Sequence, residues 1–82
     1  MLFSLLRARL LEEIGRLIRG GQFSERSLAR RLGASQPHIH NVCKGTRLLT
    51  IAFADHILVE LNIPIEKLIS PQDLERIRSR RT

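Results

Sequence analysis

The sequence predicts an all-α fold, a compact bundle of five or six helices in a single domain spanning residues 1–82. Three observations support this prediction. Apolar residues recur at spacings of three and four along most of the chain, and few stretches alternate apolar and polar residues as a half-buried strand would. Glycine, proline, serine and threonine separate these stretches at positions that favour helix ends. Aromatic residues make up only 4% of the chain, so aliphatic side chains must fill the core.

The first predicted helix covers residues 2–18. Its apolar positions form one stripe, and charged residues occupy the other positions. The stripe consists of Leu2, Phe3, Leu6, Leu10, Ile14 and Leu17. We expect Leu2, Leu6 and Leu10 to supply the apolar outer surface of a dimer interface. A basic amphipathic helix can also lie on an anionic membrane, but packing against protein is the preferred interpretation.

The second predicted helix covers residues 25–32. Ser24 is a suitable N-cap, because its hydroxyl can accept a hydrogen bond from a free backbone N–H of the first turn. Ser27 stands where a reciprocal capping box has Glu or Gln, so we expect a single cap. Gly33 follows the helix and can adopt the positive φ that a tight turn requires.

The third predicted helix covers residues 36–44 and begins directly after that turn. Ser35 is its expected N-cap, and Pro37 falls in the first turn, where a missing N–H costs least. Gly45 ends the helix. The residues expected to pack the two helices together are Leu28, Ala29, Leu32, Gly33, Ile39 and Val42. Residues 24–45 therefore have the layout of a helix-turn-helix.

Three more helices complete the prediction. Thr50 caps a helix at 51–61, which ends before Asn62, a residue that tolerates the left-handed conformation. A short helix at 64–68 opens on a proline. A basic helix at 72–81 closes the domain and carries four arginines that can touch phosphates or remain solvated.

The chain resembles the Cro/C1-type (XRE-like) helix-turn-helix repressors over about residues 22–69. The matching positions in the helix pair are Ser24, Leu28, Ala29, Leu32, Gly33, Ser35, Ile39, Val42 and Gly45. The matching positions further along are Ile57, Leu61, Ile63, Leu68 and Ile69. The resemblance implies a lambda-repressor-like domain that binds double-stranded DNA.

The start of the second helix of such a pair enters the major groove and contacts base edges. By position, the expected base-reading residues are Ser35, Gln36, Pro37, His38, His40 and Asn41. Gln and Asn side chains can bond bidentately to adenine. Pro37 cannot donate to a base, but it can touch a thymine methyl group.

The expected phosphate-binding residues are Arg26, Lys44 and Arg47, which flank the helix pair. Glu25 departs from the resemblance, since relatives often have Gln there. Its carboxylate repels phosphate unless Arg26 or another basic neighbour neutralises it, or it serves only the helix dipole.

The charge distribution agrees with a nucleic-acid partner. The net charge is +6, and residues 1–47 carry nine Lys or Arg against three Glu. Residues 48–70 carry one Lys against three acidic residues, and residues 71–82 carry four Arg against two. The positive excess therefore lies on the helix pair and the tail.

Several other classes of protein are not favoured. Cys43 is the only cysteine, so no disulfide can form within the chain and a reducing cytoplasm is expected. The run from His38 through His40 to Cys43 lacks the spacing of a metal site, and no catalytic constellation stands out. We therefore expect no enzyme activity, metal or cofactor. No stretch is long and apolar enough for a membrane span.

The predicted function is a sequence-specific transcriptional regulator, a repressor that binds a palindromic operator as a homodimer. Two alternatives remain open. The chain is compatible with the DNA-binding antitoxin of a toxin–antitoxin pair, which would add a toxin partner. It is also compatible with a protein-binding helical module whose basic face meets an acidic partner.

Overall fold

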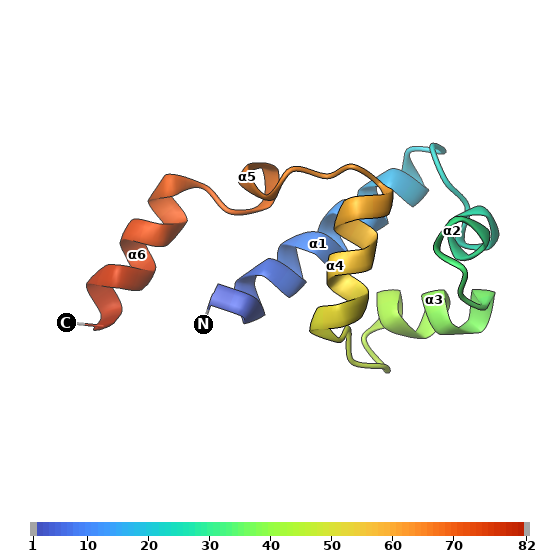
Figure 1. Ribbon diagram of the computed structural model, residues 1–82, viewed down its shortest axis with the longest axis horizontal. Helices are drawn as coiled ribbons and strands as arrows, with labels where there is room; N and C mark the ends of the chain where they lie inside the picture. The colour runs from blue at the N-terminus through green and yellow to red at the C-terminus, as the bar shows by residue number, and fades with distance from the viewer. Residues whose placement is uncertain (1, 82) are drawn as a thin grey trace.

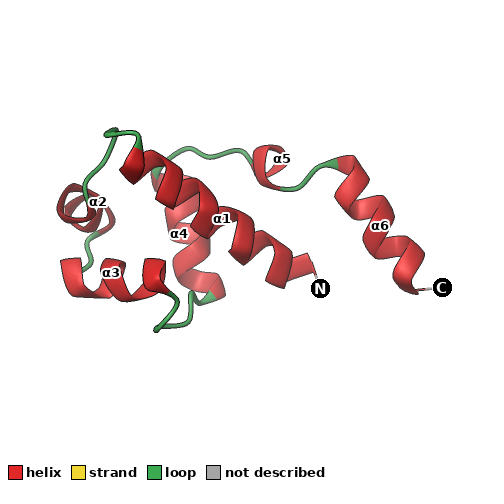
Figure 2. Ribbon diagram, turned by 180° about the vertical axis from the view of Figure 1, so that it is seen from behind, coloured by secondary structure: helices red, strands yellow, loops and turns green. Residues whose placement is uncertain are grey.

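The computed structural model describes residues 2–81, and every regular element in that range is a helix (Figure 1). The all-α prediction is therefore confirmed. The helices are α1 (Leu2–Arg19), α2 (Glu25–Leu32), α3 (Gln36–Lys44), α4 (Ile51–Glu60), α5 (Ile65–Leu68) and α6 (Pro71–Arg81). Helix α2 packs against α3 and α4, whereas α1 packs against α3 and α5. The molecule measures 43 × 22 × 20 Å, with the α2–α3 pair at one end of its long axis and α6 at the other (Figure 1 and Figure 2).

The helices begin and end within one residue of the predicted positions, because the signals that end them are local. The Thr50 hydroxyl accepts a hydrogen bond from the Phe53 backbone N–H at 3.1 Å and so caps α4. Asn62 adopts a φ of 53° just after the same helix, as its tolerance of this conformation predicts. His56 then links α4 to α2, since its Nε2 lies 2.9 Å from the carbonyl oxygen of Leu32.

The prediction of a single cap on α2 is wrong. The Ser24 hydroxyl accepts from the Ser27 N–H at 3.0 Å, and the Ser24 N–H donates to the Ser27 hydroxyl at 2.9 Å. The short side chain of Ser27 therefore reaches far enough to complete the reciprocal capping box, in which Glu or Gln usually stands at this position. Ser70 and Asp73 form the same arrangement at the start of α6, at 2.9 and 3.1 Å.

The core is a single aliphatic cluster to which every helix except α6 contributes buried apolar side chains. Its members are Leu10, Ile14, Leu28, Ala29, Leu32, Ile39, Val42, Leu49, Ala54, Ile57, Ile63, Leu68 and Ile69. The expectation that Leu10 belongs to an outer dimer surface is wrong, because its side chain is 0% exposed. Helix α1 packs against α3 and α5, and its exposed large apolar side chains, Leu2 and Phe3, lie in its first turn. Leu2 is exposed and Leu6 is half-buried.

Two buried carboxylates tie α1 to the C-terminal part of the chain. Glu13 on α1 accepts from Arg16 at 2.7 and 2.8 Å and pairs with Lys67 Nζ of α5 at 2.9 Å. The hydrogen bonds from Arg16 and then Lys67 lower the pKa of the Glu13 carboxyl from 4.5 to about 2. Asp73 on α6 accepts from both terminal nitrogens of the Arg9 guanidinium, from Nη2 at 3.2 Å and from Nη1 at 3.3 Å.

Asp73 is held in its charged form chiefly by its own helix cap. The hydrogen bond from the Ser70 backbone, with help from the Ser70 hydroxyl and from Arg9, lowers the pKa of Asp73 from 3.8 to about 2. Arg9 also donates to the carbonyl oxygen of Leu68 at 3.0 Å. The first turn of α6 is therefore fixed to α1, although the helix then extends away from the body.

Acid is expected to destabilise the fold through these two carboxyls. Each has a lower pKa in the folded than in the unfolded chain, so its contribution is complete above about pH 4.5 and is lost as the pH falls towards 2. The melting temperature, followed by circular dichroism, should fall through this range. Glu13→Gln and Asp73→Asn should each flatten the fall, while Glu12→Gln, an exposed neighbour on α1, should leave it unchanged. Acid profiles of all three variants parallel to that of the wild type would contradict this account.

Candidate nucleic-acid interface

A three-residue turn joins α2 to α3 and sets the direction of α3. Gly33 ends α2 with a φ of 68°, and the N–H of Ala34 donates to the carbonyl of Ala29 at 2.9 Å. A Cβ atom at Gly33 would meet no other atom within 4 Å, so glycine is required there by its backbone conformation and not by lack of space. The Ser35 hydroxyl then accepts from the His38 N–H at 3.2 Å and caps α3 as predicted.

The apolar side chains of the two helices meet across this turn. Leu28, Ala29 and Leu32 are between 1 and 4% exposed, and Ile39 and Val42 are each 2% exposed. These five residues are therefore buried in the core cluster. Because one face of α3 is buried in this way, its other face is turned outward.

The outward face of α3 carries most of the predicted base-reading side chains. The exposed residues are Ser35, Gln36, Pro37, His40 and Asn41. Gln36 borders a shallow hollow of about 630 Å³ whose wall also includes Glu25 and Arg26 from α2. The structure therefore brings one predicted base-reading residue and one predicted phosphate-binding residue to the same depression.

Three members of the predicted set, His38, His40 and Asn41, have contacts within the protein that the sequence did not reveal. The His38 ring is half-buried and packs edge-on against the Phe53 ring of α4, with the ring centroids 5.0 Å apart. Asn41 holds the loop after α3, since its carbonyl accepts from the N–H groups of Thr46 and Arg47 at 3.0 and 3.1 Å. The Gln36 side chain is therefore more exposed than that of His38, whose ring packs between its own helix, α3, and α4.

Glu25 finds its basic partner on α3 and not in the adjacent Arg26. His40 Nδ1 lies 3.1 and 3.2 Å from the two carboxylate oxygens of Glu25. A carboxylate accepts, so the Nδ1 position carries the proton and Nε2 is the ring nitrogen left on the far side. This pair joins the first residue of α2 to the middle of α3.

The predicted phosphate-binding cations surround this face. Arg26 lies in the first turn of α2, Lys44 ends α3, and Arg47 follows the left-handed cap at Gly45; all three cations are exposed. Arg31 has an internal role instead, because it donates to the carbonyl of Glu60 at 3.3 Å and its guanidinium lies 5.9 Å from the centre of the Phe23 ring.

The remaining chemistry of the site is limited. Burial raises the pKa of the Cys43 thiol, and the charge of Glu25 raises it further, so the thiol is held in its protonated form. Among the described residues, no three His, Cys, Asp or Glu side chains are grouped so that they could hold a metal ion. None of the described helices combines the length and the apolar character needed to cross a lipid bilayer.

Comparisons with known proteins give no identification. No protein-family model matches the chain, and neither a curated protein nor a solved structure shows significant similarity to it.

Proposed function

We propose that the protein is a sequence-specific DNA-binding transcriptional regulator, a cytoplasmic repressor that binds a palindromic operator as a homodimer. One observation carries the proposal. Helix α3 is capped at both ends, buries Ile39 and Val42, and turns Gln36 and Asn41 outward. Hydrogen-bonding side chains on a rigid, exposed helix are what direct reading of base edges in the major groove requires.

The charges around α3 support the same proposal. Arg26, Lys44 and Arg47 flank the helix on exposed positions, and exposed cations beside a base-reading element fix its register on the phosphate backbone. The carboxylate of Glu25 would oppose phosphate binding. Its pairing with His40 reduces that repulsion whenever the imidazole is protonated.

Selection from random DNA tests the proposal. The protein is mixed with a pool of duplexes of random sequence, bound duplexes are recovered over several rounds, and the survivors are sequenced. We expect enrichment of an inverted repeat with half-sites about one helical turn apart, or a multiple of it. Binding without enrichment would contradict sequence-specific recognition, and no binding at low salt would reject the proposal.

Lys44→Ala and Arg47→Ala are expected to weaken binding to every DNA sequence alike. Each removes one phosphate contact, so the slope of log affinity against log salt should become shallower by about one. A salt titration of the binding constant on two unrelated duplexes measures this. Arg31→Ala is the matched control, because the Arg31 guanidinium is already engaged by Glu60 and Phe23. A slope that is unchanged in the two variants would count against their phosphate role.

A further inference from the structure

Helix α6 extends from the body without being packed into the core. Its anchoring contacts lie at its first turn, where Asp73 meets Ser70 and Arg9. Beyond that turn, the helix runs out at the far end of the molecule from α3 (Figure 2). Leu74 is 38% exposed and Ile77 is half-buried, and the two lie on one side of the helix at a spacing of three. The helix therefore presents an apolar edge between basic residues.

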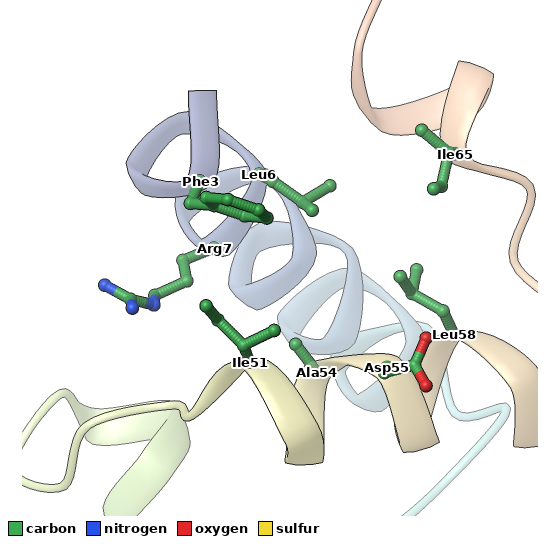
Figure 3. A pocket seen from close by; sticks show the side chains of 8 residues that line it. All are labelled: Phe3, Leu6, Arg7, Ile51, Ala54, Asp55, Leu58 and Ile65. Carbon is green, nitrogen blue, oxygen red and sulfur yellow. The ribbon is translucent and has the colours of Figure 1, made fainter. Parts of the chain in front are cut away.

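An apolar groove lies beside this helix. It has a volume of about 430 Å³ between the first turns of α1, helix α5 and the start of α6, and its walls include Phe3, Leu6, Ile65 and Leu74. Phe3, Leu6 and Ile65 also line a second hollow of about 160 Å³ between α1 and α4, so the two hollows share three lining side chains (Figure 3). Phe3 is 56% exposed and Ile65 is 54% exposed. Large apolar side chains that are exposed next to one another favour an interaction site.

The charge at the border of the groove indicates what kind of segment would bind in it. Glu66 lines the larger groove and is acidic, whereas the smaller hollow is lined by both Asp55 and Arg7, whose charges offset each other. Residues 48–70 carry three acidic side chains and one Lys, whereas residues 71–82 carry four Arg and two acidic side chains. The larger groove therefore has an acidic residue at its border, and α6 has an apolar edge and a net positive charge.

We propose that the groove of one copy is covered by helix α6 of a second copy, and that the exchange is reciprocal. The same patch then serves both subunits, as a two-fold axis requires. Leu74 lines the groove of its own copy, and the apolar edge that runs from it to Ile77 covers Phe3, Leu6 and Ile65 of the other copy. The arginines of that α6 approach Glu66. The inference deepens the homodimer of the proposed function, but it is tested without DNA, so the two can fail separately.

The mass of the full chain in solution, measured by sedimentation equilibrium over a range of concentrations, tests the proposal. We expect a dimer whose dissociation constant rises at least about tenfold in Leu74→Asp and in Phe3→Asp, because each places a charge in a desolvated apolar contact. Val59→Asp is the matched control, since Val59 is 72% exposed and lines neither hollow. Circular dichroism confirms that each variant is folded. A wild-type monomer at high concentration, or a dimer that resists both groove variants, overturns the proposal.

Charge reversal tests whether α6 is the segment that occupies the groove. Glu66→Lys and Arg78→Glu should each weaken the dimer, because each places like charges together. The double variant should regain much of the lost affinity. A double variant that is weaker than either single variant overturns the placement of α6 in the groove.

Discussion

Gln36→Ala is expected to weaken binding to the preferred DNA site by about 1–3 kcal/mol while sparing binding to unrelated DNA. Gln36 is exposed in the first turn of α3, and the cap at Ser35 fixes the direction in which that turn begins. A glutamine amide can donate to and accept from the same adenine, so its removal costs both hydrogen bonds at one base pair. Dissociation constants on the selected site and on a scrambled duplex measure the effect.

Gln72→Ala is the matched control for this experiment. Gln72 is also an exposed glutamine in the first turn of a helix, but that helix is α6, at the opposite end of the molecule. Its removal should change neither dissociation constant. An equal loss on both duplexes in Gln36→Ala, or no loss on either, would refute the base-reading role of Gln36.

Ala29→Leu is expected to destabilise the protein by about 1–3 kcal/mol. Ala29 is 3% exposed between α2 and α3, among side chains that are themselves buried. Three added carbon atoms have no space there, so α3 must move or neighbouring side chains must leave their preferred rotamers. Urea denaturation followed by circular dichroism measures the free energy of unfolding.

Ala52→Leu provides the comparison for that measurement. This substitution makes the same change of side chain, but at an exposed position of α4. Its free energy of unfolding should differ little from that of the wild type. If Ala29→Leu were equally harmless, Ala29 could not be a position at which α2 and α3 pack too closely for a larger side chain.

Most of the fold could be predicted from the sequence because its boundaries depend on neighbours in the chain. Ser35 and Thr50 cap helices through hydrogen bonds that span three residues, and Gly33 and Asn62 adopt positive φ at helix ends. The exposure of Gln36 followed from its place in the first turn of α3, directly after the Ser35 cap. Periodicity accounts for His40 and Asn41, because they lie between the inward-pointing Ile39 and Val42 and must point outward.

The contacts between distant residues could not be predicted. Glu25 and His40 are 15 residues apart and Arg9 and Asp73 are 64 apart, and no periodicity relates such positions. The error at Leu10 has the same origin. An apolar stripe shows which side of a helix is buried. Which turns of that side are buried depends on where the partner helices pack, and the stripe does not show this.

Nuclear magnetic resonance of the 15N-labelled protein, with and without duplex DNA, tests directly whether the outward face of α2 and α3 is the surface that contacts DNA. We predict that the largest changes in amide chemical shift fall on residues 24–27, 35–41 and 44–47. An unchanged spectrum, or changes confined to α1 and α6, would contradict the account.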